Sequence, residues 1–485
     1  MGWVQIIADG VVVLNTFFAI LTVFRQHRDI STTWAWLLVL VLLPVVGFLL
    51  YIFLGRGMGR EKLFTIEHQD RTGLQEMIAM QQHDDVEFDT PLSEKVTANA
   101  SSMVRLFETN DNAPLTKRNQ VEIFTEGSKK FAALFADIRR AQQSIHIEYY
   151  TIYSDKIGQE LLSLLEEKAA QGVEVRVLYD AFGSHGTTQK WFHHLETLGG
   201  QAATFITSHS SITKTRLNYH CHRKIVVIDG KIGYTGGFNV GDQYLGRMPK
   251  FGYWRDTHLR IVGNGVLALQ TRFVMDWNVS VNAAKHMRYQ LKYFPKPVKT
   301  KEATTALQIV TSGPTSDREQ IKAGYIKMIS MAKKSIWLQS PYLVPDESVL
   351  SALTIAAQSG IDVRIMIPHM PDHPFIYRAT QYYAQILFAA GVKIYIYEKG
   401  FLHAKTAIMD GKVSSVGSAN QDIRSYKLNF EVNAFMYDIK IAKQLSRIFT
   451  LDMGHCRLLT QEEIDRQSYW LTIKQRFSRL LSPIL

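Results

Sequence analysis

His222-Arg-Lys-Ile-Val-Val-Ile-Asp-Gly230 is repeated further along the chain as His403-Ala-Lys-Thr-Ala-Ile-Met-Asp-Gly411. An asparagine follows each histidine at the same spacing, Asn239 in the first copy and Asn420 in the second. One His-x-Lys-x4-Asp match is weak evidence, because three fixed residues recur by chance in a long chain. Two matches in the same register indicate an internal repeat.

The repeat extends to the residues around both segments. Ser144–Ile152 resembles Ser335–Leu343, and each is followed by a helical pattern rich in Leu and Ala. These helices are expected to end near Gly172 and Gly360, because glycine adopts a left-handed cap at little cost. The strands that follow are expected at Val173–Tyr179 and Ile361–Ile367. This alternation predicts an α/β fold with two related α/β/α lobes, each with its own central mixed sheet.

The histidine and the lysine of each segment are two residues apart, so they point to the same face of a predicted strand. His222 with Lys224, and His403 with Lys405, therefore each place an imidazole beside a fixed positive charge. Such a pair suits an anionic phosphate.

The aspartate of each segment has the opposite strand parity. Asp229 and Asp410 each begin an Asp-Gly pair, which is typical of a tight hairpin turn. The spacing therefore predicts a mainly structural role for both aspartates.

The first 55 residues are strongly apolar. No charged residue occurs from Ser31 to Gly55, and residues 33–54 can cross ~30 Å of hydrocarbon at ~1.5 Å per residue. Residues 3–24 form a second candidate span, which contains Asp9. We therefore expect a transmembrane helical hairpin over residues 1–55 that is retained in the mature protein. Basic residues just after it favour the cytoplasmic side for the rest of the chain.

Composition narrows the possible partners and folds. The formal net charge of +11 and a pI near 9.3 favour an anionic partner, either nucleic acid or an acidic membrane surface. The only cysteines, Cys221 and Cys456, exclude a disulfide framework and a multi-cysteine zinc site. At 485 residues the chain is long enough for at least two large lobes.

The expected order of domains after the hairpin is a connector at 56–118, a first lobe at 119–295 and a second lobe at 306–485. The second lobe includes a C-terminal amphipathic segment with basic residues among Tyr469, Trp470, Ile473, Phe477 and Leu480. This segment is expected either to lie on anionic lipid or to pack against the lobes, and the sequence does not decide between them.

The paired motifs resemble those of the phospholipase D superfamily, in which two His-Lys-Asp motifs meet at one site between two lobes. Within it, three strings look like the bacterial cardiolipin synthases, and these strings are Arg223–Asp242, Tyr253–Arg260 and Leu428–Phe435. The similarity covers nearly the whole chain. It implies two phospholipase D-like lobes in a multi-pass protein of the bacterial cell membrane.

The resemblance also implies a reaction. A phosphatidyl group would pass from one phosphatidylglycerol to the primary hydroxyl of another through a phosphohistidine intermediate, giving cardiolipin and glycerol. The expected partners are phosphatidylglycerol and cardiolipin in an anionic membrane, with no nucleic acid, nucleotide or metal. The oligomeric state is left open.

The two motifs supply the catalytic set that the resemblance implies, namely His222, Lys224, Asp229, His403, Lys405 and Asp410. One histidine would attack phosphorus, and the other would act as general acid and then general base. The family analogy favours His222 as the nucleophile, although the residues alone do not choose. We expect a structural role for His220 and no reactive role for Cys221.

Further residues would hold the phosphate and the imidazoles. Asn239 and Asn420 would join the two lysines around the phosphate oxygens, where charge develops in the transition state. Asp256 and Glu431, placed similarly after the two motifs, would orient the imidazoles.

Four other functions share part of this pattern. A hydrolytic phospholipase D, or a transferase with another head-group acceptor, would use the same histidines. A nuclease of the superfamily would have no need of the apolar run at 33–54. A membrane scaffold without activity would not need to keep both histidine-lysine pairs.

Overall fold

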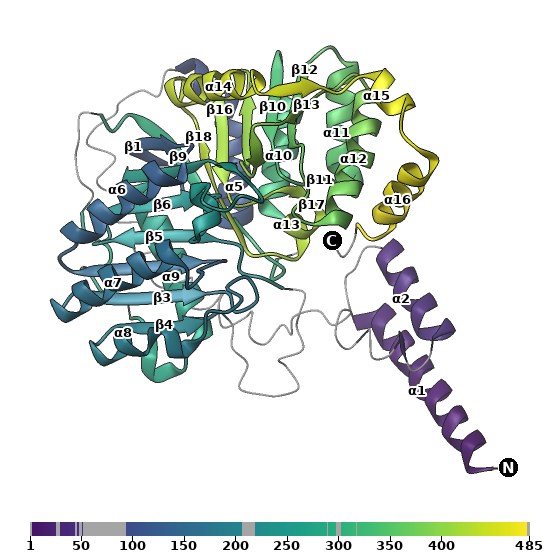
Figure 1. Cartoon of the computed structure of the whole chain (residues 1–485), viewed down its shortest axis with the longest axis horizontal. Helices are drawn as coiled ribbons and strands as arrows, with labels where there is room; N and C mark the ends of the chain where they lie inside the picture. The colour runs from purple at the N-terminus through teal and green to yellow at the C-terminus, as the bar shows by residue number, and fades with distance from the viewer. Residues whose placement is uncertain are drawn as a thin grey trace. The chain divides into compact units, whose positions relative to one another are not determined.

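A computed structural model describes residues 2–25, 30–43, 46–47, 51, 94–205, 219–288, 290–296, 302–316 and 318–482 (Figure 1). The chain divides into two compact units. The first comprises residues 1–63 with 207–219, and the second comprises residues 64–206 with 220–485.

The first unit contains two helices that pack against each other, α1 (Trp3–Arg25) and α2 (Ile30–Leu42). The residues of the first expected span, 3–24, form the helix α1, and its place in a membrane stays a prediction. Of the helix expected at 33–54, α2 covers the first part, and most residues after 43 lie outside the described ones. Among the helices that the structure describes, none combines the length and the apolar character needed to cross a membrane.

The second unit is built on a mixed sheet of fifteen strands. One half has the order β1 (Thr116–Phe124), β8 (His258–Gly263), β6 (Ile232–Gly236), β5 (Lys224–Ile228), β2 (Ser144–Tyr149), β3 (Glu174–Tyr179), β4 (Gln201–Thr204). The other half repeats it as β9 (Thr305–Ser312), β18 (Glu431–Met436), β16 (Val413–Gly417), β15 (Thr406–Met409), β10 (Ser335–Gln339), β12 (Asp362–Pro368), β13 (Lys393–Tyr397), with β19 (Cys456–Leu458) added outside. The internal repeat is therefore a repeat of strand order.

The two central sheets expected from the sequence are joined into one, which corrects the expectation of a separate sheet in each lobe. The join is the antiparallel pairing of β1 with β9. The Asn119 side chain reinforces it, because Nδ2 donates to the Thr305 carbonyl of β9 at 3.1 Å. Its Oδ1 accepts from the Gly265 amide of the first lobe at 2.7 Å, which fixes the orientation of the side chain. Pairing satisfies the backbone groups that two open sheet edges would leave without partners.

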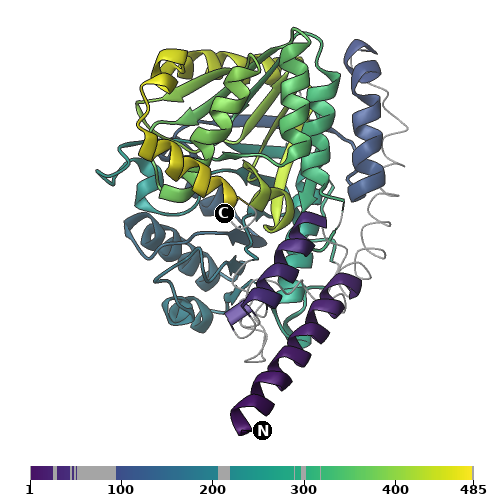
Figure 2. The ribbon, with the colours of Figure 1, turned by 90° about the vertical axis from the view of Figure 1, so that its right-hand side faces the viewer.

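Helices cover both faces of the sheet, giving three layers (Figures 1 and 2). In the first lobe these are α6 (Gly127–Arg140), α7 (Lys156–Ala170), α8 (His193–Thr197) and α9 (Gly265–Ser280), and in the second α10 (Gln320–Met331), α11 (Glu347–Gln358), α12 (Pro374–Ala389) and α14 (Ile439–Met453). The second lobe also contains the helices α13 (Ile423–Lys427), α15 (Gln461–Asp465) and α16 (Tyr469–Leu480). Alternate residues of β5 enter opposite cores: Val226 packs with α6 and α7, whereas Val227 packs with α9. Both faces of the strand are thus buried, which explains its continuous apolar sequence.

The predicted strand-helix-strand units are confirmed at β2–α7–β3 and β10–α11–β12. Gly172 and Gly360, just after the helices, have φ of 83° and 86°, where a side chain would be strained. The connector contains one described helix, α5 (Glu94–Asp111), which packs on α10 and β9. Residues 56–93 of the connector lie outside the described ones.

The predicted hairpin turns are also confirmed. Asp229 and Gly230 have φ of 51° and 62°, and the Lys231 amide donates to the Ile228 carbonyl at 3.0 Å. The Asp229 carboxylate accepts from the backbone amides of residues 142–144 at 2.7 to 3.2 Å. Asp410 repeats this arrangement with φ of 53° and the amides of residues 333–335.

Asp229→Ala is therefore expected to lower the free energy of unfolding by ~1–3 kcal/mol, because several amides lose their acceptor. The turnover number of the folded fraction should change little, since five residues of strand, ~16 Å, separate this turn from His222. Urea unfolding measured beside turnover tests this. Asp229→Asn is the matched control, because asparagine tolerates the same φ. A large loss of turnover at unchanged stability would indicate a chemical role instead.

Candidate active site

Each histidine lies where a segment of one lobe pairs with a segment of the other. Cys221 forms a parallel bridge with Phe430, and the His222 amide donates to the Phe430 carbonyl at 2.9 Å. Equivalently, β14 (Gly400–Leu402) pairs in parallel with β7 (Tyr253–Arg255), and the His403 amide donates to the Arg255 carbonyl at 2.7 Å. Because Glu431 follows Phe430 and Asp256 follows Arg255, each histidine meets the carboxylate of the opposite lobe.

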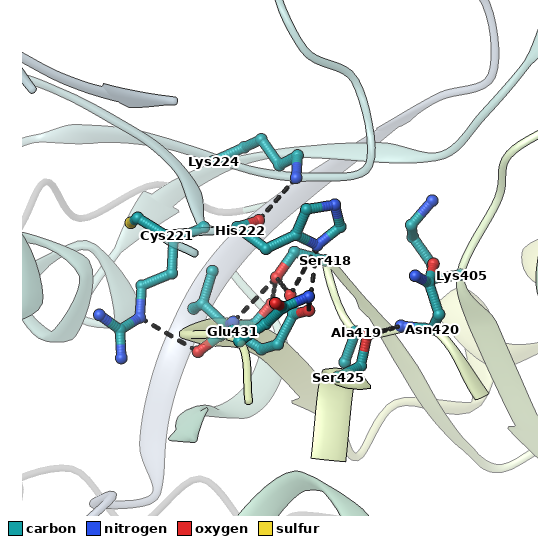
Figure 3. A network of polar contacts seen from close by, with 12 residues as sticks. Cys221, His222, Lys224, Lys405, Ser418, Ala419, Asn420, Ser425 and Glu431 are labelled. Carbon is teal, nitrogen blue, oxygen red and sulfur yellow. Dashed lines mark hydrogen bonds and ion pairs between the residues drawn. The ribbon is translucent and has the colours of Figure 1, made fainter. Parts of the chain in front are cut away.

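His222 is held by Glu431, and both are buried (Figure 3). Its Nδ1 lies 3.0 Å from each carboxylate oxygen of Glu431. The Ser418 hydroxyl and the Asn429 amide donate to the same carboxylate. Burial opposes ionisation, yet His222 and Lys224 hold the pKa of Glu431 at about 2. The carboxylate can then only accept, so Nδ1 carries the proton and Nε2 keeps its lone pair.

His403 is held in the same way by Asp256. Its Nδ1 lies 2.6 Å from Asp256 Oδ2, and the Thr257 amide donates to Oδ1 at 2.7 Å. Burial alone would raise the pKa of Asp256, but the charges of His403 and Lys405 keep this pKa below its usual value. The two histidines are thus related by the repeat, and each has one ring nitrogen fixed by a carboxylate.

Both lysines belong to the same cluster. Lys224 donates to the His222 carbonyl at 2.6 Å, and Lys405 donates to the His403 carbonyl. Each lysine feels the charge of both Glu431 and Asp256, which brings the two motifs into one electrostatic site. Figure 3 shows Lys224 and Lys405 together with His222 and Glu431. Burial lowers the pKa of Lys224 to about 7 and the pKa of Lys405 to about 8.

Burial also lowers the pKa of both His222 and His403 to about 4, with the nearby lysines acting in the same direction. At neutral pH both imidazoles are therefore neutral. An anion placed between them would favour protonation of the imidazoles and lysines, because it offsets the repulsion within the cluster.

Aromatic rings flank the imidazoles. The ring of Tyr150 lies 5.0 Å from that of His222, and the Trp254 ring lies 5.1 Å from that of His403. Phe401 is a further neighbour of His403 at 6.0 Å. These rings reduce the access of water to the site. Sequence reasoning favoured a core or rim position for Tyr150 over contact with the substrate, and it assigned no role to Trp254 or Phe401.

The two asparagines expected to bind phosphate have protein partners. Asn239 accepts from the Thr151 amide at 3.2 Å and donates to the Tyr244 hydroxyl at 3.2 Å. Asn420 donates to Asp422 at 3.1 Å. Both are buried near the ends of β6 and β16, and their contact with phosphate remains a prediction.

Two buried ion pairs support the segments that pair between the two lobes. Arg255 lies 2.8 Å from Asp452, which also accepts from Gln339 at 2.8 Å. Arg223 lies 2.6 Å from Asp276, and its Nε donates to the Glu431 carbonyl at 3.2 Å. Sequence reasoning missed both pairs. Asp276 lies near the end of α9 and Asp452 near the end of α14, and these similar positions were the signal in the sequence that could have indicated the two ion pairs.

The residues just before the first motif are buried. His220 stacks on Phe182 at 4.6 Å, with its Nδ1 3.8 Å from Asp180. The Cys221 thiol lies 2.8 Å from Glu148, and burial raises the pKa of the thiol. A thiolate is therefore disfavoured at Cys221, in line with the expectation that it is unreactive.

Comparisons with known proteins agree with this geometry. The model described as "Cardiolipin synthase, PLD-like domain" matches residues 134–248 and 325–453, and "Phospholipase_D-nuclease N-terminal" matches residues 13–56. Cardiolipin synthase of Listeria innocua is 48% identical over 485 residues, covering 100% of both chains. Major cardiolipin synthase ClsA of Bacillus subtilis is 47% identical over 475 residues, covering 98% of both.

A solved structure shares the fold at low identity. Phosphatidylserine synthase of Haemophilus influenzae superposes with a TM-score of 0.59 at 15% identity, covering 79% of this chain and 99% of that one. The full-length similarity to curated relatives and the repeated domain match together establish the family. The chain belongs to the cardiolipin synthase family of the phospholipase D superfamily.

Proposed function

We propose that the protein transfers a phosphatidyl group from one phosphatidylglycerol molecule to another, producing cardiolipin and glycerol. The observation that carries this proposal is the crossed pair of dyads, His222 with Glu431 and His403 with Asp256, beside two buried lysines. Two imidazoles that are each fixed by a carboxylate support a double displacement at one phosphodiester, and the family is named for this product.

In the first step, His222 Nε2 attacks the phosphorus of a bound phosphatidylglycerol. The bond from phosphorus to the head-group oxygen breaks, and that oxygen takes a proton from His403. Glycerol leaves, and the phosphatidyl group remains on His222 as a phosphoramidate. Lys224 and Lys405 stabilise the charge that develops on the non-bridging oxygens.

In the second step, neutral His403 removes the proton from the primary hydroxyl of a second phosphatidylglycerol. This oxygen attacks phosphorus, and the bond from phosphorus to His222 breaks. Cardiolipin forms, and His222 regains its lone pair while His403 regains its proton. Atoms and charge balance without any other reactant.

The contacts of the two dyads support this division of roles. Glu431 accepts from His222 and from two further side chains, Ser418 and Asn429, whereas beside His403 Asp256 accepts from one backbone amide, that of Thr257. A carboxylate with fewer competing donors stabilises an imidazolium more strongly. This difference favours His403 as the residue that is protonated before the first step.

Anion binding is expected to weaken as the pH rises through 7 to 8. The pKa of Lys224 is about 7 and that of Lys405 is about 8, so both are charged below this range and neutral above it. The inhibition constant of sulfate, whose charge is constant over this range, should rise by up to about tenfold per pH unit for each lysine. A pH-independent constant would contradict the assignment.

We propose further that residues 1–55 attach the protein to the cell membrane as a hairpin of two spans, 3–24 and 33–54. The uncharged run from Ser31 to Gly55 and the family match at 13–56 support this. The catalytic lobes would lie on the cytoplasmic side. Proteolysis of inside-out and right-side-out vesicles tests the sidedness, because only the former should expose the lobes.

The reaction is tested with purified full-length protein and phosphatidylglycerol labelled in its head group. Cardiolipin with one released glycerol for each product molecule is the expected result. Phosphatidic acid as the main product would indicate a hydrolase, and a new phosphodiester only with another added alcohol would indicate a different acceptor. The absence of any turnover would favour a membrane scaffold without catalytic activity.

A further inference from the structure

The C-terminal helix α16 has its polar and apolar faces in an unexpected orientation. The side chains it buries are Gln475 and Ser478, whereas its large apolar side chains are exposed. Those exposed side chains are Tyr469, Trp470, Ile473, Phe477 and Leu480, and all but Ile473 are more than half exposed. A helix that packs only on its own protein normally buries its apolar side.

Polar contacts explain how α16 stays attached. It lies on α12 at the outside of the second lobe (Figure 1). Gln475 contacts Gln381 at 3.4 Å and Gln385 at 3.2 Å, and the Arg479 guanidinium stacks on the Tyr382 ring at 5.2 Å. The Ser468 side chain caps its first turn. The helix is therefore held without using its apolar face.

The apolar side chains form one continuous strip. At about 100° per residue, the five positions fall within an arc of roughly 100° on the side opposite Gln475 and Ser478. Exposed Lys474 and Arg476 lie on the two borders of this arc. We call this strip and its two basic borders the outer face of α16.

We propose that the outer face of α16 docks onto the surface of an anionic lipid bilayer. Aromatic and aliphatic side chains bordered by cations match the boundary between acyl chains and acidic head groups. The net charge of +11 agrees with such a partner. Docking gives the second lobe its own attachment to the membrane, independent of residues 1–55.

The test measures the environment of one label in the full-length protein. Phe477→Cys, in a Cys456→Ser background, is labelled with an environment-sensitive fluorophore, and Cys221 is buried and does not compete. The protein is reconstituted into vesicles of equal parts phosphatidylserine and phosphatidylcholine. Because phosphatidylserine is not the proposed substrate, the result is independent of catalysis. Leu451→Cys, an exposed apolar position on α14, is the matched control.

Docking predicts a blue shift of the label at position 477 and loss of its fluorescence to quencher-bearing lipids, with neither effect at position 451. Lys474→Glu with Arg476→Glu should reduce the quenching, as should phosphatidylcholine alone. A blue shift without lipid quenching would mean that protein covers the face, either residues 1–63 or a second copy. That result, or a label that remains in water, would overturn the proposal.

Discussion

His222→Ala is expected to abolish turnover and to leave no phosphatidyl group bound to the protein. Loss of a nucleophile from a cooperating catalytic set typically costs on the order of 10⁴-fold or more in rate. His403→Ala should cost about 10²- to 10⁴-fold, because it removes proton transfer but leaves the attacking nitrogen in place. Both expectations follow from the buried, carboxylate-oriented imidazoles of the site.

The measurement is turnover of phosphatidylglycerol that carries radioactive phosphorus in its phosphate, which stays on the enzyme after glycerol leaves. It is combined with an alkaline quench, since a phosphoramidate survives base and is lost in acid. Label should remain on the wild-type protein and be absent from His222→Ala. His220→Ala is the matched control, because His220 precedes the same motif but its side chain contacts Asp180 and Phe182. Label that persists in His222→Ala and disappears from His403→Ala would reverse the two roles.

Glu431→Gln and Asp256→Asn form the second large-effect prediction, with an expected loss of about 10²- to 10⁴-fold in turnover number. Each carboxylate fixes which nitrogen of its histidine carries the proton. A carboxamide can donate to Nδ1 instead, which moves the proton to Nε2 and removes the lone pair that attacks phosphorus. Glu431→Gln should therefore prevent formation of the labelled phosphohistidine at His222, although Glu431 belongs to the opposite lobe.

The double variant His222→Ala with Glu431→Gln should be no slower than His222→Ala alone, because the two residues act as one unit. Glu398→Gln is the control, since Glu398 is a half-exposed carboxylate paired with Arg457 outside the site. Turnover of Glu431→Gln within about tenfold of wild type would contradict the orienting role.

Local signals account for what could be predicted from the sequence. The Asp-Gly pairs at 229 and 410 have side chains and φ angles that suit one kind of turn. Gly172 and Gly360 mark helix ends for the same reason. The apolar runs of β5 and β15 follow from burial on both faces. These features depend on neighbours in sequence, so a single chain reveals them.

Features that depend on contacts between residues far apart in the chain could not be predicted from the sequence. The pairing of β1 with β9 has no local signature, because an edge strand and an inner strand can have the same sequence pattern. The sequence also did not indicate that each histidine pairs with the carboxylate of the other lobe. Glu431 follows the second motif at a similar spacing as Asp256 follows the first, whichever histidine it contacts. The ion pair of Arg255 with Asp452 likewise joins residues far apart in the chain.

The crossed dyads imply an evolutionary history for the fold. In this structure the histidine of each lobe pairs with the carboxylate of the other lobe, so one lobe alone would lack the partner of its histidine. Two copies related by a twofold axis, joined edge to edge as β1 joins β9, would complete both dyads at once. Gene duplication and fusion would then have converted a symmetric homodimer into a single polypeptide, freeing the two histidines to specialise as nucleophile and proton carrier.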